Sequence, residues 1–497
     1  MDFFSNFIHG FQIVLQPINL LYCFIGVFVG TLVGVLPGIG PTGTIAILLP
    51  TTFVLPPVAG IIMLAGIYYG AMYGGSTTSI LVNIPGEAAS VVTCLDGYQM
   101  AIKGRAGPAL GISALGSFIG GTIALVPLMF LVHPLAEVAV KFGPPEFFAI
   151  MCMGLSLVTY LVRGSFLKAV IMAVLGLFLG SVGTDTISGR LRFTLGIAGL
   201  SDGIGLVPMV MGLFGVSEVL TNIEKTTKIE ILKAKIKHFF PTLNDWKRSI
   251  GAIIRGTFLG FGLGVLPGGG SIISSFVSYT IEKKLSKHPE EFGFGAIEGV
   301  AGPETANNAA TAGGFVPLLA LGLPPNVIMA LLLGALLVHG VTPGPMFISN
   351  HPDIFWGLVA SMFLGNAMLL ILNLPVIPLW VKLLKVPYQI LFPLIILFCL
   401  IGSYSINNSI FDIITMLAFG VIGYVLRKYK YEEAPLGLAF ILGPMMEQAF
   451  RQSLIMSDGS LFIFFTRPIS AVAISLSIAI FISTGVAFVR KPRDKIT

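Results

Sequence analysis

The sequence contains one unusual stretch twice, GVFVGTLVGVLPGIG at residues 26–40 and GTFLGFGLGVLPGGG at residues 256–270. The two copies agree at nine of fifteen positions and start 230 residues apart. In each copy an apolar segment runs into Pro-Gly-x-Gly, which interrupts a helix because proline lacks an amide donor and glycine adopts turn conformations readily. A chain that breaks a helix at matching places in two halves is typical of a membrane transporter with a duplicated fold.

The composition supports a membrane location for nearly the whole chain. Apolar residues make up 55% and charged residues 10% of the 497 residues, and the mean hydropathy is +0.93. A soluble chain of this length would carry roughly 25% charged residues. We count about 12–14 hydrophobic segments of the length that a helix needs to cross a bilayer. The sequence therefore predicts an all-α polytopic membrane protein without a separate soluble domain.

The net charge of +6 is concentrated in three basic clusters, namely residues 225–248, Arg427–Lys430 and the tail from Arg490 to Lys495. Loops rich in lysine and arginine stay on the cytoplasmic side of a membrane. This explanation is favoured over nucleic-acid binding, so no nucleic-acid partner is expected. All three clusters, and with them the C-terminus, are predicted to lie in the cytoplasm.

The first basic cluster divides the chain into residues 1–222, a first transmembrane repeat, residues 223–249, a cytoplasmic linker, and residues 250–497, a second repeat with additional C-terminal helices. A second pair of stretches supports this division: GGSTTSILVNIPGE begins at Gly74 and GGFVPLLALGLPPN at Gly313, 239 residues later. The nine extra residues fit within the charged loop at 282–292. Two homologous halves in the same order indicate duplication. We favour inverted repeats with broken helices or re-entrant hairpins near the middle of the membrane.

The two helix breaks are the first candidate site. The glycines that precede them, spaced four apart, suit close helix packing. A helix that begins after the break presents free amide groups and the positive end of its dipole, which favours an anion. Carbonyl groups at the end of the preceding helix suit a cation such as Na⁺. The predicted substrate contacts at the breaks are Gly38, Gly40, Thr42, Gly268, Gly270 and Ser271.

Polar residues around the second pair of stretches form the other candidate site. The predicted side-chain contacts to substrate are Ser76, Thr77, Asn83, Asn307 and Asn308, and the predicted ion-coupling residues are Glu304 and Thr311. Ionisable groups within a membrane generally mark transport pathways. The alternative is that Glu298 and Glu304 lie in a surface loop. Because Pro85-Gly86-Glu87 stands where the second half has Pro324-Pro325-Asn326, the two arms of the site are not chemically equivalent.

Two common enzymatic motifs are absent from the sequence. It contains no HExxH and no Walker-type phosphate loop, and no GxGxxG follows an expected strand. The four cysteines are scattered singly, so neither a cofactor nor a metal beyond a Na⁺ site is expected. We predict a protein that is not an enzyme and is driven by an ion gradient. Glu447 and Arg451, four residues apart, are predicted to form a structural ion pair, and Asp185 and Asp202 to lie in a loop.

Several stretches together resemble a known family: GVLPGIGPTGTIAILLP (34–50), YYGAMYGGSTTSILVNIPGE (68–87), EGVAGPETANNAATAGGFVPLLALGLPP (298–325), VTPGPMF (341–347) and PLGLAFILGPMMEQAFRQSL (435–454). The chain resembles the large membrane subunit of the tripartite tricarboxylate transporters.

That resemblance implies secondary import of a citrate-like di- or tricarboxylate, coupled to Na⁺ or H⁺, across a prokaryotic cytoplasmic (inner) membrane. It further implies a small membrane subunit and an extracytoplasmic binding protein that delivers substrate. A passive carboxylate channel and a membrane scaffold subunit of a partner complex remain the alternatives.

Overall fold

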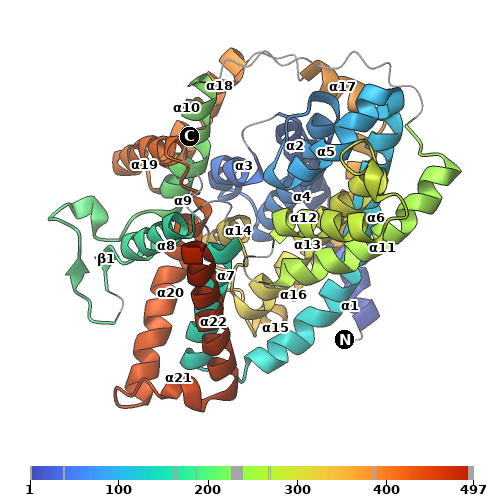
Figure 1. The fold of residues 1–497 in the computed structure, drawn as a ribbon. Helices are drawn as coiled ribbons and strands as arrows, with labels where there is room; N and C mark the ends of the chain where they lie inside the picture. Colours follow the sequence, from blue (N-terminus) through green and yellow to red (C-terminus); the bar gives the residue numbers. More distant parts are fainter. Residues whose placement is uncertain are drawn as a thin grey trace.

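The computed structural model describes residues 3–36, 40–161, 165–185, 187–224, 239–266, 268, 270–383 and 388–490. This part of the chain is almost entirely helical (Figure 1), apart from one antiparallel pair of two-residue strands, β1 (Gly183–Thr184) and β2 (Leu191–Arg192). Seven segments of it are long and apolar enough to cross a membrane, and three shorter apolar helices accompany them. The predicted all-α polytopic membrane protein is confirmed.

The helices before the basic cluster at 225–248 are α1 (Phe3–Val14), α2 (Pro17–Val35), α3 (Gly40–Leu48), α4 (Pro57–Val82), α5 (Val91–Met100), α6 (Ala106–Ala139), α7 (Pro144–Leu161), α8 (Phe166–Gly180), α9 (Leu206–Val210) and α10 (Ser217–Glu224). Those that follow are α11 (Leu243–Val265), α12 (Gly270–Leu285), α13 (Glu298–Leu321), α14 (Val327–Val338), α15 (Phe347–Asn350), α16 (Pro352–Leu372), α17 (Ile377–Leu383), α18 (Tyr388–Asn407), α19 (Ile410–Lys428), α20 (Ala434–Met456), α21 (Ile463–Thr466) and α22 (Pro468–Arg490).

The glycines that precede each helix break pack against another helix, as predicted. A Cβ atom on Gly26, Gly30 or Gly34 of α2 would lie 2.4–2.5 Å from a backbone oxygen of α4. On Gly256, Gly260 or Gly264 of α11 it would lie 2.2–2.6 Å from a backbone oxygen of α13. Only glycine allows such an approach of two backbones, and within lipid this close packing is what holds helices together.

The two helix pairs correspond in sequence. The carbonyls that face the α2 glycines belong to Met63, Ile67 and Ala71, and those that face the α11 glycines belong to Gly302, Ala306 and Ala310, each 239 residues later. Helices α4 and α13 also end 239 residues apart, at the left-handed caps Asn83 and Gly322. These are the offsets of the two sequence motifs, so they support duplication. The inverted orientation of the repeats remains a prediction.

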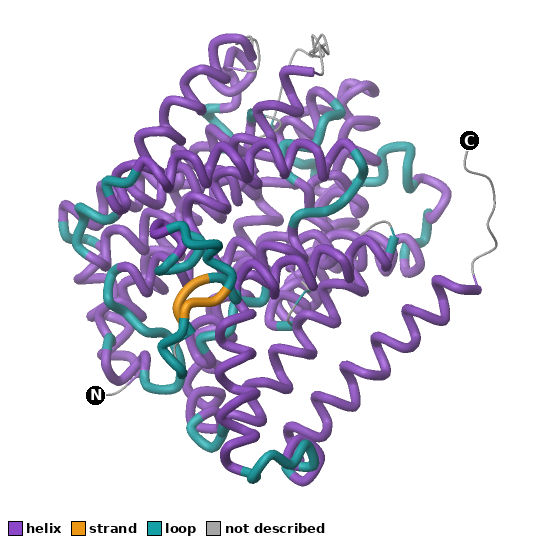
Figure 2. The backbone as a smooth tube through the Cα atoms, turned by 90° about the vertical axis from the view of Figure 1, so that its left-hand side faces the viewer, coloured by secondary structure: helices purple, strands orange, loops and turns teal. Residues whose placement is uncertain are grey.

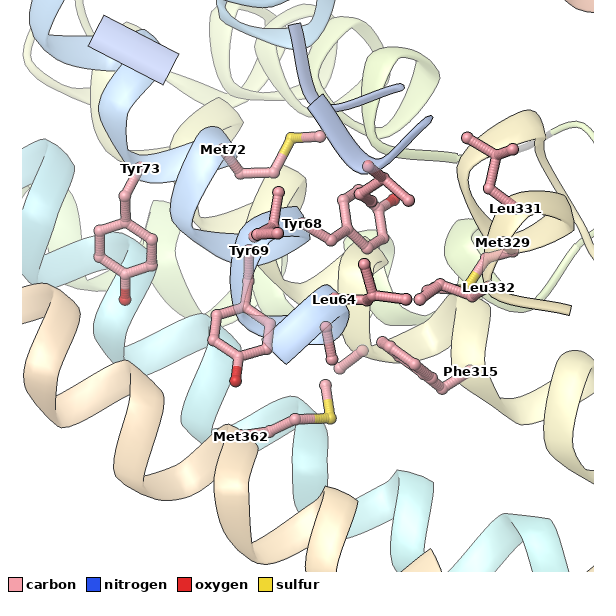
Figure 3. Packing of buried hydrophobic residues seen from close by; sticks show 14 of the residues in the cluster. Leu64, Tyr68, Tyr69, Met72, Tyr73, Phe315, Met329, Leu331, Leu332 and Met362 are labelled. Atoms are coloured by element: carbon pink, nitrogen blue, oxygen red, sulfur yellow. The ribbon is translucent and has the colours of Figure 1, made fainter. Parts of the chain in front are cut away.

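Helices of the two halves share one core. Helix α6 packs along α13 and α11, and α16 packs against α4 and α6, with α2, α4, α12 and α13 near the middle of the molecule (Figure 1). Figure 3 shows Tyr69 of α4 pointing toward Met362 of α16, while Tyr68 points in a different direction, toward α14, which carries Met329. One hydrophobic core thus contains residues from both sides of the boundary at 223–249, which stays a prediction.

The outer helices present apolar side chains on the surface. Helix α22 runs along the outer edge of the molecule (Figure 2) and exposes Val472, Leu476, Phe481 and Ile482. Exposed aliphatic and aromatic side chains along a span-length helix suit contact with lipid tails. A bilayer partner is thus consistent with the surface as well as with the composition.

Polar groups at the molecule's periphery behave as the sequence suggested. Arg451 Nη1 donates to Glu447 Oε1 at 3.2 Å, which confirms the predicted ion pair within α20. Arg192 of β2 also pairs with Glu447, at 2.7 Å, and Arg451 pairs with Asp185 at 2.8 Å. Asp185 and Asp202 lie in the β1–β2 loop and the turn after it, as predicted. This ion-pair network ties that loop to α20.

Candidate functional site

The two helix breaks have matching local geometry. Helix α3 starts at Gly40 (φ +64°) and helix α12 starts at Gly270 (φ +54°), so each begins on a residue in the left-handed region that glycine tolerates. The hydroxyls of Thr44 and Ser274 donate to the carbonyl oxygens of Gly40 and Gly270 at 2.7 and 2.8 Å. The first turns of both helices therefore expose amide groups that have no partner within their own helix.

The second break is held by a contact to the start of α14. Gly268, at φ +78°, donates its amide hydrogen to the carbonyl oxygen of Pro325 at 2.8 Å. Pro325 belongs to the Pro-Pro-Asn turn that the sequence placed opposite Pro-Gly-Glu. This bond joins the two motifs of the second half. Pro37, Gly38 and Ile39 of the first break, with Pro267 and Gly269 of the second, lie outside the described residues.

A cavity of about 680 Å³, called the central cavity below, lies where the two breaks meet. It is lined by residues of both breaks, by the turn and start of α14, by Glu87 and by Tyr68. Its volume is in the range of small-molecule sites. The predicted contacts that line it are Gly40, Thr42, Gly268, Gly270 and Ser271.

The other predicted site residues lie elsewhere. Asn83 ends α4 on the surface, and Ser76, Thr77, Asn307, Asn308, Glu304 and Thr311 are buried within α4 and α13 without lining the central cavity. Thr311 donates to the carbonyl oxygen of Asn307 at 3.1 Å. Their roles in substrate and ion binding stay predictions, and the structure joins several of them in one network behind the cavity.

Glu304 is the centre of that network. It is 1% exposed within α13, so the alternative that it lies in a surface loop is wrong. Its carboxylate accepts a hydrogen bond from Ser76 at 2.5 Å and another from Thr93. Glu298 also lies in α13, in its first turn, where Arg248 pairs with it at 2.8 Å. Burial of Glu304 is therefore offset by two hydroxyl donors from the first half of the chain.

Glu87 connects the buried network to the central cavity. Its carboxylate accepts from the backbone amide of Ala89 at 2.5 Å and from the Asn307 side chain at 3.3 Å, and it lines the cavity. The carboxamide oxygens of Asn307 and Asn308 have no hydrogen-bond partner among the described residues. An acceptor buried without a partner costs about 1–3 kcal/mol, so such groups are retained mainly where another donor or a cation uses them.

Contacts between the halves are reciprocal. Asn307 reaches Glu87, and the residues 239 positions away from these two, Tyr68 and Asn326, also approach each other. The Tyr68 hydroxyl additionally lies 3.5 Å from the hydroxyl of Ser271. Contacts of this kind, in which residue i of one unit meets j of the other and the equivalent j meets i, are typical of two related units that pack face to face. One arm of the site thus carries a carboxylate at Glu87 where the other carries the amide of Asn326.

Sequence reasoning made no substrate-binding prediction for several polar residues that line the cavity, among them Tyr68, Glu87, Asn326 and Arg427. Glu87 and Asn326 were visible as the chemical difference between the two proline turns, and each caps the element that follows it. Tyr68 has a weaker signal: it lies 239 residues before Asn307, which is the offset of the second pair of stretches. Arg427 was assigned only to a basic cluster, because nothing in its neighbours indicates that the end of α19 borders the cavity.

Comparison with known proteins identifies the family of the chain. The family model described as "Tripartite tricarboxylate transporter TctA family" matches residues 20–438. The chain is 51% identical over 496 residues to an uncharacterized 52.8 kDa protein of Agrobacterium vitis from the TAR-I ttuC′ 3′ region, covering 100% of this chain and 99% of that one.

A second Agrobacterium vitis protein, uncharacterized and from the TAR-II ttuC′ 3′ region, is 51% identical over 234 residues, which is 47% of this chain and 97% of the relative. No solved structure matches. With a family model over most of its length and a full-length relative at this identity, the chain is a multi-pass membrane protein that belongs to the TctA family of tripartite tricarboxylate transporters.

Proposed function

We propose that the protein is the permease through which an organic di- or tricarboxylate enters a prokaryotic cell across its cytoplasmic (inner) membrane. Import is driven by a Na⁺ or H⁺ gradient and needs no other cofactor. An extracytoplasmic binding protein delivers the substrate, and a small membrane subunit completes the complex. Membership of the family supports transport of a carboxylate by this chain. The particular substrate and the partner subunits are part of the proposal.

The observation that carries the proposal is the meeting of two helix breaks at one cavity. The first turns of α3 and α12 line the central cavity with Ser271, Tyr68 and Asn326 around them. Helix N-termini hold anions through free amides and the dipole, without a buried cation. A citrate-sized anion fits within about 680 Å³ and would meet donors from both halves.

The buried network supports coupling to a cation. Glu304 and Thr311 stay the proposed ion-coupling residues. The carboxamide oxygens of Asn307 and Asn308, which have no hydrogen-bond partner within the described part of the chain, provide additional ligands of the type that Na⁺ accepts. Because Asn307 contacts Glu87 at the cavity wall, a charge change in the network is transmitted to the substrate site through one hydrogen bond.

The test is uptake of radiolabelled citrate, malate and succinate into proteoliposomes that contain the permease, the small subunit and the binding protein. We expect uptake to depend on one of the two gradients and to stop when an ionophore collapses that gradient, whether it is Na⁺ or H⁺. Uptake that survives collapse of both would identify a passive channel. Absence of uptake, together with no stabilisation of the protein by any carboxylate, would identify a scaffold.

A variant pair on α12 tests the site itself. Ser271→Ala removes a hydroxyl that lines the cavity, and we expect citrate affinity to fall about fivefold, the effect of one hydrogen bond. Ser278→Ala, seven residues further along α12, is the control because Ser278 is buried but does not line the cavity. Equal affinities of the two variants would contradict the assignment. The double variant Asn307→Ala/Asn308→Ala should alter uptake kinetics for another reason, because it removes the contact between Asn307 and Glu87 and two oxygen ligands proposed for the coupling ion.

A further inference from the structure

A cluster of charged side chains joins three elements near one end of the central cavity. Arg427, in the last turn of α19, forms ion pairs with Glu218 of α10 and with Glu433, the residue that precedes α20. The three side chains, called the Arg427 cluster below, are only 22%, 19% and 11% exposed. Ion pairs this far from solvent hold their elements together, because separation would leave a partly buried charge without a partner.

The Arg427 cluster stands between two cavities. Arg427 and Glu432 line the central cavity, and both also line a second pocket of about 510 Å³. Glu218 and Glu433 line this second pocket as well, together with the polar side chains of Thr221 and Lys428. A single guanidinium group and its two carboxylate partners therefore occupy the boundary between the proposed substrate site and a charged pocket beyond it.

The charge of Arg427 suits it to contact the substrate. Among the described residues that line the central cavity, Arg427 is the one basic side chain, whereas Glu87 and Glu432 are acidic. A guanidinium group binds a carboxylate through two parallel hydrogen bonds. The same geometry is available to a glutamate side chain and to a carboxylate of the substrate. A substrate with two or three carboxylates can therefore take the place of Glu218 or Glu433 without leaving Arg427 unpaired.

We propose that the Arg427 cluster is a substrate-operated gate. Arg427 exchanges its glutamate partners for a carboxylate of the bound substrate, α10 and the start of α20 are released from α19, and the central cavity becomes continuous with the second pocket. A ligand shifts a conformational equilibrium only by the difference in its affinity for the two states, and the new Arg427–substrate pair supplies that difference. Since Arg427–Lys430 is a predicted cytoplasmic cluster, this is the gate on the release side.

The gate rests on the proposed carboxylate site, so binding and opening are measured separately. Binding is measured as stabilisation of detergent-purified protein by citrate, malate and succinate. Opening is measured with a reporter cysteine, Ile328→Cys, which lines the central cavity. Inverted vesicles, which expose the cytoplasmic face, are treated with a membrane-impermeant maleimide. The labelling of the chain without the reporter cysteine is subtracted as background.

We expect the bound carboxylate to accelerate labelling of the reporter about tenfold in the otherwise unaltered protein. Glu218→Gln/Glu433→Gln should label quickly without substrate. Arg427→Gln should bind the carboxylate about ten- to a hundredfold more weakly, the effect of losing a charge-assisted pair, and should lose the acceleration by substrate. Arg427→Lys should recover part of both.

Arg192→Gln is the matched control, because Arg192 forms a bidentate pair with Glu447, at 2.7 and 3.1 Å, in a cluster that lines neither cavity. It should behave as the unaltered protein does. A carboxylate that stabilises the reporter protein but leaves its labelling rate unchanged would overturn the gate and leave the proposed function standing. If no carboxylate stabilises the protein, both are overturned.

Discussion

Gly260 of α11 shows how little space the chain leaves between its central helices. A Cβ atom there would lie 2.2 Å from the carbonyl oxygen of Ala306, and that oxygen belongs to the backbone of α13 and cannot rotate away. Gly262, two residues along the same helix, has nothing within 4 Å of the same position. The two glycines share a helix but only one of them faces a partner.

We expect Gly260→Ala to destabilise the protein by about 1–3 kcal/mol, the usual cost of overpacking, because the two helices must separate. Gly262→Ala should be neutral or stabilising by up to about 1 kcal/mol, since alanine is the better helix former. Thermal unfolding in detergent, followed by fluorescence-detected size exclusion, measures both. Similar midpoints for the two variants would show that α11 and α13 are not in close contact.

Asp185 anchors the β1–β2 loop. Hydrogen bonds from the Ser188 hydroxyl at 2.5 Å and the Ile187 amide at 3.1 Å, together with the Arg451 ion pair, hold the pKa of this carboxyl well below its ordinary value. These interactions favour the ionised form. They contribute to stability above the ordinary pKa of about 4 and are lost as the pH falls through the lower folded value.

The resistance of this loop to proteolysis should therefore decrease as the pH falls. We expect cleavage of the 185–201 segment by pepsin to increase progressively from about pH 4 downward in the unaltered protein. Asp185→Asn removes the ionisable group, so the loop should be more accessible and lack this pH-dependent component. Cleavage by an acid-independent protease at pH 7 is the control for local unfolding in the variant. A pH profile shared by both proteins would contradict this role for Asp185.

At the scale of elements, the residue that caps the start of α14 also belongs to the proposed substrate site. The side chain of Asn326, its N-cap, accepts from the amide of Met329 at 3.0 Å, and the same residue lines the central cavity. The turn before it accepts the amide hydrogen of Gly268 at 2.8 Å. The start of α14 thus sets the position of the second helix break.

Two substitutions of Asn326 separate these roles. Asn326→Ala should lower stability by about 1 kcal/mol because the cap is lost. Asn326→Asp keeps the cap but places a negative charge in the cavity, so we expect stability near that of the unaltered protein and carboxylate affinity lowered by at least about tenfold. Thermal unfolding and citrate binding in detergent are the measurements. Unchanged citrate affinity in Asn326→Asp would place the substrate elsewhere.

At the scale of the whole molecule, the buried network around Glu304 needs side chains from both halves. Glu304 of α13 depends on Ser76 and Thr93 of the first half, and α6 packs against both α11 and α13. In an isolated second half, the Glu304 carboxylate would either face lipid or stay buried without a hydrogen-bond donor. Both states cost free energy. The cross-half contacts are therefore required for the fold as well as for the site.

Co-expression of residues 1–224 and 239–497 as separate chains tests this dependence. We expect the two pieces to copurify through a tag on either one, and each piece alone to accumulate poorly or aggregate. Detergent extracts of cells that each express one piece, mixed before the purification, serve as the control for adventitious association. Two pieces that are each monodisperse and fail to copurify would show that the halves fold independently.

Much of this architecture could be predicted from the sequence. The glycine spacing predicted close helix packing, and the structure shows that the partners are α4 for α2 and α13 for α11. The nine-residue difference between the two motif offsets reappears in the facing carbonyls of α4 and α13. The breaks at Gly40 and Gly270 were identified because proline and glycine act locally on the backbone. The difference between Glu87 and Asn326 was visible as soon as the two proline turns were aligned.

Side-chain partners were decided by the tertiary structure. Ser76 was predicted to contact substrate, and in the structure it donates to Glu304, 228 residues away; Arg427 belonged to a basic cluster, and it lines the central cavity. Helical periodicity gives the face on which a residue lies but not the element that this face meets. The sequence by itself determined a membrane fold of two related halves with two broken helices, since these depend on hydrophobicity and local backbone chemistry. Only the packing of distant helices decided which polar groups satisfy one another and which border the cavity, because that depends on contacts hundreds of residues apart.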